Sequence, residues 1–170
     1  EGAQARGMSL NGLQNFNAIP GHGVSATVEG RHLLIGNLKL MNREGVGLGT
    51  LEEKSKALAD DGKTPMYIAI DGQAAGILAV ADTIKEDSKA AIAQLKKMGL
   101  EVVMITGDNE RTANAIARQV GVERVMAEVL PQDKAFNVQK LQLEGKKVAM
   151  VGDGINDAPA LAQADIGLAI

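Results

Sequence analysis

A chain of 170 residues is long enough for one large or two small domains with buried cores. It has no run near the roughly 18–20 apolar residues of a membrane span, no signal-peptide pattern at its N-terminus, and no cysteine for disulfides or thiolate metal sites. A net charge of −3 and only three aromatic residues leave neither a basic surface nor a stacking platform for nucleic acid.

The first part of the chain predicts an antiparallel sheet. Two pairs of apolar, β-branched runs flank the short turns Glu29-Gly30 and Asp71-Gly72, which is typical of β-hairpins. A helical pattern between the two hairpins ends at Asp61-Gly62. The expected strands are residues 24–28, 32–35, 66–70 and 74–80, and the expected helix is residues 50–60.

From Asp87 onward, helical and strand patterns alternate regularly. Repeated β-α-β units with right-handed crossovers form an open parallel sheet. The polar stretch 81–87 before them is the expected boundary, which gives domains 1–81 and 82–170. The expected helices are 87–98, 110–120, 132–143 and 158–163, and the expected strands are 101–106, 124–128, 147–151 and 166–169.

The most informative motif follows the expected strand 147–151 and reads Gly152-Asp153-Gly154-Ile155-Asn156-Asp157-Ala158-Pro159. The glycines allow a sharp turn at the strand end, so that Asp153 points beyond the sheet, where ligands of such sheets bind. Mg²⁺ takes one or two carboxylates and completes its shell with waters or phosphate oxygens. The alternative is an ordinary turn before a helix.

Two weaker motifs agree with it. Thr106-Gly107-Asp108-Asn109 follows a buried strand. A hydroxyl together with backbone N–H groups at a helix N-terminus can form a phosphate-binding site. Lys134 falls in the first turn of a helix, where a cation opposes the helix dipole, which suggests that it neutralises a phosphate. Alone, the first motif is also typical of a plain turn and the second of a solvated lysine.

In this order and spacing, the three motifs resemble those of the phosphorylation domain of heavy-metal P-type ATPases, within the haloacid dehalogenase-like superfamily. The resemblance covers essentially the whole chain. It implies an α/β fold with a parallel, Rossmann-like phosphorylation domain, plus a partial α+β nucleotide-binding domain with an antiparallel sheet. It also implies site roles: Thr106 and Gly107 bind the phosphoryl group, and Lys134 offsets its charge. Mg²⁺ is ligated by Asp153 and Asp157, and Asp108 and Asn156 are further catalytic residues of the site.

The chain departs from that family at the nucleophile. The family's nucleophile is the aspartate of an Asp-Lys-Thr-Gly-Thr segment, and the 170 residues contain no such segment. Asp61-Gly62-Lys63-Thr64 contains some of the same residue types, but in another order, and it precedes an expected strand instead of ending one. The chain therefore resembles a fragment that begins after the nucleophile, and we expect it to form no aspartyl-phosphate.

A second candidate site lies in the first part, where Gly21 and Gly23 enter a strand and Gly36-Asn37 leaves one. On its own, a Gly-x-Gly is typical of a strand-entry turn. The family resemblance makes Gly21, Gly23, Val24, Gly36 and Asn37 candidates to line an adenine pocket. That pocket normally includes a glutamate and a Ser-Glu-His-Pro segment, which the chain lacks, so we expect nucleotide to bind more weakly than to an intact domain.

The implied function is the cytosolic ATP-binding and phosphorylation part of a pump, acting with Mg²⁺ and ATP and exporting Cu⁺. Its partners would be ATP or ADP and the membrane and metal-binding domains of the same pump, at the cytoplasmic face of a membrane. This chain would not bind the transported metal. The alternatives are a Zn²⁺/Cd²⁺ pump, a haloacid dehalogenase-like phosphatase, which the two-hairpin domain fits poorly, and a non-catalytic nucleotide-binding module.

Overall fold

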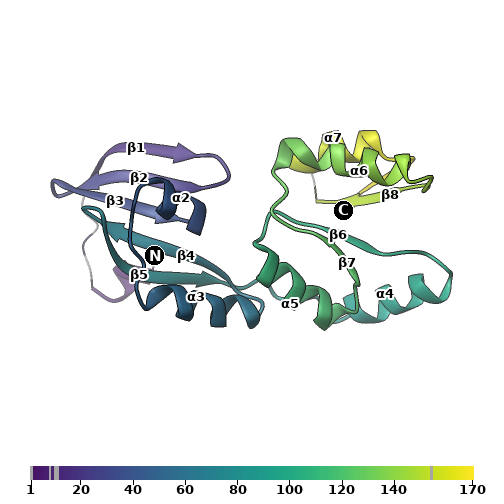
Figure 1. The fold of residues 1–170 in the computed structure, drawn as a ribbon, viewed down its shortest axis with the longest axis horizontal. Coiled ribbons are helices and arrows are strands. Elements are labelled where there is room, and N and C mark those ends of the chain that lie inside the picture. Colours follow the sequence, from purple (N-terminus) through teal and green to yellow (C-terminus); the bar gives the residue numbers. More distant parts are fainter. Residues whose placement is uncertain (1, 8, 10–11, 154) are drawn as a thin grey trace. The chain divides into compact units, whose positions relative to one another are not determined.

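The computed structural model describes residues 2–7, 9, 12–153 and 155–170, and the chain divides into two units, Glu1–Asp82 and Thr83–Ile170 (Figure 1). The expected boundary lies one residue earlier, after residue 81. Gly154 of the C-terminal motif falls outside the described residues. Among the helices that the structure describes, none is long and apolar enough to cross a membrane.

The first unit contains a five-stranded antiparallel sheet in which neighbours in the chain are neighbours in space (Figure 1). Both central residues of each expected hairpin turn adopt positive φ, 52° and 75° at Glu29-Gly30 and 50° and 78° at Asp71-Gly72. This geometry matches the twist of the flanking strands. The strands are β1 (Leu13–Ile19), β2 (Gly23–Val28), β3 (Arg31–Gly36), β4 (Thr64–Ile70) and β5 (Gln73–Val80).

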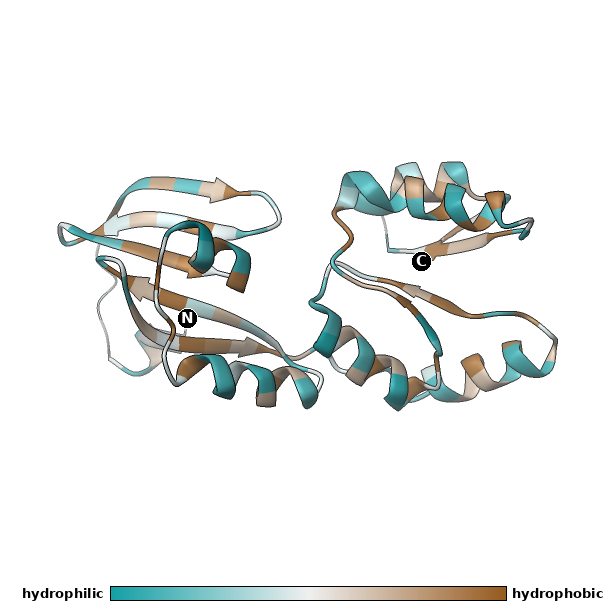
Figure 2. Cartoon of the chain, in the orientation of Figure 1, coloured by the Kyte–Doolittle hydropathy of each residue, from teal (hydrophilic) through white to brown (hydrophobic). Residues whose placement is uncertain are grey.

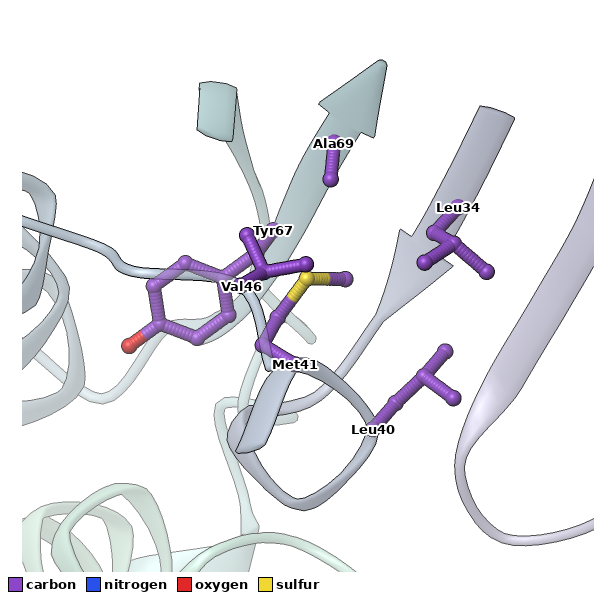
Figure 3. Close-up of a cluster of buried hydrophobic side chains, with 6 residues drawn as sticks. All are labelled: Leu34, Leu40, Met41, Val46, Tyr67 and Ala69. Atoms are coloured by element: carbon purple, nitrogen blue, oxygen red, sulfur yellow. The ribbon is translucent and has the colours of Figure 1, made fainter. Parts of the chain in front are cut away.

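Three helices accompany this sheet: α1 (Gly2–Ala5), α2 (Leu38–Arg43) and α3 (Leu51–Asp60). Helix α2 buries its apolar side against β3 and β4, and the core cluster there includes the residues that Figure 3 draws together, namely Leu34, Leu40, Met41, Val46, Tyr67 and Ala69. Helix α3 adds a buried hydrogen bond between the Ser55 and Tyr67 hydroxyls. The core of this unit therefore lies between the sheet and the helices α2 and α3.

The second unit alternates helices and parallel strands, as expected. Its helices are α4 (Ser88–Lys97), α5 (Glu110–Val120), α6 (Lys134–Leu143) and α7 (Ala158–Gln163). Short 3-10 turns, Pro131–Asp133 and Ile155–Asp157, precede α6 and α7. The strands are β6 (Val103–Ile105), β7 (Arg124–Met126), β8 (Ala149–Gly152) and β9 (Ile166–Ala169).

The strands of the second unit pair in parallel, and in the described residues they form two two-stranded ladders, β6–β7 and β8–β9. Hydrophobic residues colour much of β6 and β7, while the helices alternate between hydrophobic and hydrophilic positions (Figure 2). Small residues let α5 pack closely: Ala113, Ala115 and Ala117 are buried, and Ala117 contacts Val120 and Val122 in the local core. Parallel pairing places the loops that follow paired strands at the same edge of their ladder.

Candidate functional site

The loop after β6 is held by its own polar groups. The Thr106 hydroxyl donates to a carboxylate oxygen of Asp108 at 2.8 Å and accepts from the Asp108 N–H at 3.1 Å. The next residue, Asn109, caps α5, because its amide oxygen accepts from the Thr112 N–H at 3.0 Å. Gly107, between Thr106 and Asp108, is exposed. The result is a fixed turn, with a hydroxyl and backbone groups at the N-terminus of an eleven-residue helix.

The loop after β7 is hydrogen-bonded to the loop after β6. The Glu128 N–H donates to the Asp108 carbonyl at 2.9 Å, and the Val129 N–H donates to the Thr106 carbonyl at 3.0 Å. Glu128 adopts a positive φ of 56°, where non-glycine residues are uncommon. The chain then turns into α6, so the Thr106 loop and the segment leading to Lys134 belong to one edge of the unit.

Lys134, the first residue of α6, forms a partly buried ion pair with Asp157, which precedes α7. Its ammonium donates to one carboxylate oxygen at 2.5 Å, and the side chains are 19% and 8% exposed. The Lys134 ammonium, outweighing the effect of burial, holds the pKa of Asp157 below its usual range. Asp157 is therefore ionised at neutral pH and fixes the position of Lys134.

The other carboxylate oxygen of Asp157 faces the end of β8. It accepts from the Asp153 N–H at 3.4 Å. Gly152 is required next to it, because a Cβ at that position would lie 2.6 Å from the Asp157 Cβ and 2.7 Å from its carboxylate oxygen. Asp157 therefore joins the turn after β8 to the start of α6.

The two carboxylates expected to bind Mg²⁺ differ in environment. Asp153 is exposed at the end of β8, whereas Asp157 is buried and occupied by Lys134 and the Asp153 N–H. Among the described residues, no three acidic, histidine or cysteine side chains gather as a ready metal shell. An exposed carboxylate can bind Mg²⁺ when phosphate oxygens and waters supply the remaining ligands, so Asp153 fits that ion better than Asp157, whose oxygens already have partners.

The first unit presents the second candidate site, where β2 begins and β3 ends. Gly23 and Gly36 are direct partners across the two strands, and Val24 pairs with Ile35. A Cβ on Gly23 would lie 2.2 Å from the Ile35 carbonyl, and one on Gly36 would lie 2.3 Å from the His22 carbonyl. Only glycine fits this close approach. Gly21, with a φ of 71°, is exposed in the preceding turn.

Asn37 follows this contact and caps α2, with its amide oxygen accepting from the Leu40 N–H at 3.0 Å. The predicted site residues thus form two sets, one in each unit. In the second unit, hydrogen bonds join Thr106 and Asp108 to the loop after β7, and Asp157 joins Lys134 to Asp153. Asn156 is exposed in the 3-10 turn between Asp153 and α7. The sequence did not indicate the Lys134–Asp157 pair, because nothing in their 23-residue separation signals contact.

The family of the chain follows from its similarity to known proteins. The model of the haloacid dehalogenase-like hydrolases matches residues 3–165. The chain belongs to the haloacid dehalogenase-like hydrolase family. Within it, copper-exporting P-type ATPases of Staphylococcus epidermidis and Bacillus subtilis (strain 168) are each 52% identical to it over 169 residues, 99% of this chain. The chain spans about a fifth of their length (21%).

Solved structures agree on the fold of this haloacid dehalogenase-like chain. A zinc-transporting PIB-type ATPase in its E2.Pi state is 34% identical, with a TM-score of 0.53 over 96% of this chain and 26% of that one. The catalytic domain of the CPx-ATPase CopB-B is 23% identical, with a TM-score of 0.65 over 96% of this chain and 56% of that one. The expected combination of a haloacid dehalogenase-like domain and an antiparallel-sheet domain is therefore confirmed.

Proposed function

We propose that this chain is the ATP-handling part of a P-type pump that exports Cu⁺, with residues 1–81 as the nucleotide-binding domain and 82–170 as the phosphorylation domain. The observation that carries the proposal is 52% identity to copper-exporting P-type ATPases across 99% of the chain, which includes all three site motifs. The zinc-transporting relative, at 34%, is less similar, which favours copper over zinc.

In the first unit, the turn at Gly21 is exposed and Gly23 is half-buried, so backbone without side chains is accessible there to a flat ring, while Gly36 is buried and packs against Gly23. We assign the adenine of ATP to this place, lined by Gly21, Gly23, Val24, Gly36 and Asn37. Because the glutamate and Ser-Glu-His-Pro segment of the family pocket are absent from the 170 residues, we expect weak binding of ATP by this chain alone.

In the second unit, the edge formed by Thr106, Lys134 and Asp153 would receive the γ-phosphoryl group. Thr106 and the N-terminus of α5 supply hydrogen-bond donors, and Lys134, fixed by Asp157, supplies a positive charge. Mg²⁺, held by Asp153, would supply further positive charge next to the transferring group. Phosphoryl transfer requires mainly positioning and charge stabilisation, which these residues are arranged to give.

The nucleophilic aspartate would come from another segment of the full pump. Among the described residues, β6 pairs only with β7 and β8 pairs only with β9, so each ladder keeps an edge with unused backbone groups. We infer that a strand ending in the aspartate pairs along β6 and β8. Its last residue would then lie between Thr106 and Asp153, which follow the ends of these two strands.

The proposal is tested with the full polypeptide encoded by the source gene. Expressed at the membrane of a copper-sensitive bacterium, the wild-type protein should restore growth in copper, and the Asp153→Asn variant should not. Loss of an electrostatic group at such a site costs about 10²–10³ in rate, which is enough to abolish protection. If the wild type protects against zinc or cadmium but not copper, the protein is a Zn²⁺/Cd²⁺ pump. If the wild type protects against none of these metals, the proposal that it exports them is contradicted.

A further inference from the structure

We propose that Asn37 is a positioning residue, which acts on nucleotide binding by holding the turn of residues 20–23 in its binding shape. This inference rests on the proposed nucleotide site. In this proposal the glycines of the site leave room for the adenine, whereas Asn37 holds the turn in place.

Asn37 is connected to the turn at two points. Its side-chain amide nitrogen donates to the Gly21 carbonyl at 2.9 Å, and its backbone N–H donates to the His22 carbonyl at 2.9 Å. Its amide oxygen is also engaged, because it accepts from the Leu40 N–H and caps α2. Each end of the side-chain amide therefore has a partner within the protein, and these two hydrogen bonds fix its orientation between the turn and α2.

The other restraints on the turn come from its own residues and from strand pairing at its end. The His22 N–H donates to the Ile19 carbonyl, the His22 Nδ1 lies 2.9 Å from the Pro20 carbonyl oxygen, and Gly23 pairs with Ile19 in β1 and with Gly36 in β3. Gly21 is exposed and has a positive φ of 71°, in a region that glycine enters at no steric cost. The Asn37 side chain therefore links this exposed turn to the start of α2.

The glycine contact explains why the link is made from position 37. Gly36 lies so close to the turn that a Cβ there would be 2.3 Å from the His22 carbonyl and 2.5 Å from the Leu40 side chain. Residue 36 can therefore carry no side chain, and the next residue is the first able to reach the turn. Asn37 does so while its amide oxygen fixes the first turn of the helix that carries Leu40.

The decisive variant is Asn37→Ser. Serine is a good N-cap and keeps α2 in place, but its side chain is too short and has no amide to reach the Gly21 carbonyl. Asn37→Ala removes both the α2 cap and the hydrogen bond to the Gly21 carbonyl. Asn42→Ser, at an exposed asparagine of α2, is the matched control. Two quantities are measured on the full 170-residue chain: amide hydrogen exchange in the turn (residues 21–23, because Pro20 has no N–H) and in α2, and ATP affinity by titration calorimetry.

We expect Asn37→Ser to exchange faster than wild type in residues 21–23 and unchanged in α2, and to bind ATP about threefold to tenfold more weakly, the loss that one hydrogen bond commonly causes. Asn37→Ala should also exchange faster in α2, and Asn42→Ser should match wild type. Unchanged exchange in residues 21–23 of Asn37→Ser overturns the positioning role, and weaker ATP binding with unchanged exchange would mean direct contact. If wild type binds no ATP, the nucleotide assignment fails, and the exchange data still decide whether Asn37 holds the turn.

Discussion

At the scale of single residues, Asp157 organises the edge of the second unit. One of its carboxylate oxygens accepts from Lys134 and the other from the Asp153 N–H, while Gly152 leaves the space that its side chain occupies. The sequence motif suggests two similar acidic ligands four residues apart, but the environments separate them. Asp153 is exposed, as the Mg²⁺ ligand that we propose must be, whereas Asp157 is buried and hydrogen-bonds to the lysine and to the turn.

Removing Lys134 should destabilise the second unit. Loss of one partner of a buried ion pair costs about 3–5 kcal/mol, and because Lys134 keeps some exposure we expect Lys134→Met to cost about 2–3 kcal/mol. Hydrogen exchange at the Val138 and Leu141 amides of α6 reports this free energy. The control Lys89→Met, at an exposed lysine of α4, should change little.

A double-mutant cycle checks the cause of that loss. Adding Asp157→Asn to Lys134→Met removes the unpaired buried carboxylate, so the double variant should be more stable than the sum of the two single changes predicts. Strictly additive losses would show that the two side chains do not interact in solution.

The same pair makes stability depend on pH. Lys134 lowers the pKa of Asp157 in the folded state, so the unfolded chain takes up this proton first, near about pH 4. The stabilisation is fully present above that pH and is lost as pH falls through the lower pKa of the folded state. The difference in unfolding free energy between wild type and Asp157→Asn should therefore be constant above about pH 5 and shrink as the pH falls below about pH 4, and a difference that stays constant there would contradict the assignment.

At the scale of secondary-structure elements, the close contact between β2 and β3 is the most sensitive point of the first unit. In Gly36→Ala, the added Cβ would meet the His22 carbonyl at 2.3 Å, and a carbonyl in a paired backbone cannot move away freely. We expect a loss of about 1–3 kcal/mol, typical of overpacking, together with weaker ATP binding as the turn is displaced.

A matched glycine distinguishes this clash from a general effect of alanine in a strand. A Cβ added to Gly76 in β5 would have no other atom within 4 Å, so Gly76→Ala should leave both stability and ATP affinity close to wild type. Thermal unfolding and ATP titration of the two variants make the comparison. Equal behaviour of Gly36→Ala and Gly76→Ala would argue against the close contact.

Elements with strong local signals were predictable from the sequence. Helix α5 was expected at 110–120 and is found there, with Gly121 in the left-handed conformation that ends it. The two hairpins follow from Glu29-Gly30 and Asp71-Gly72, whose residues accept positive φ. Strands β6 and β7 were expected to be longer, because an apolar run does not indicate where ladder pairing stops.

Other elements gave no signal that sequence patterns could detect. Strand β1 is an edge strand that is almost wholly exposed, and Asn15, with a φ of 52°, lies where its register shifts, so apolar alternation is weak. Helix α2 is only six residues long, and its stability comes from burying Leu40 and Met41. Contacts between distant residues, such as Lys134 with Asp157, depend on the assembled fold and not on spacing.

At the scale of the whole molecule, each of the two units has its own core and its own candidate site. The first has the glycine contact that we assign to ATP, and the second has the edge that we assign to the phosphoryl group. Among these residues there is no Asp-Lys-Thr-Gly-Thr segment. The chain therefore contains groups that would bind and stabilise a transferring phosphoryl group without the residue that would accept it.

A phosphorylation assay should therefore distinguish this chain from the full polypeptide. Incubated with γ-labelled ATP and Mg²⁺, the 170-residue chain should acquire no hydroxylamine-sensitive label, because fixed charges and donors cannot replace a missing nucleophile. The full polypeptide should be labelled, and Lys134→Met should reduce its rate of labelling by about 10²–10³, the usual cost of losing such an electrostatic group. Label on the isolated chain would mean that one of its own aspartates accepts the phosphoryl group, with Asp108 and Asp153 the first candidates at the site. The proposal that the nucleophile lies outside these 170 residues would then be wrong.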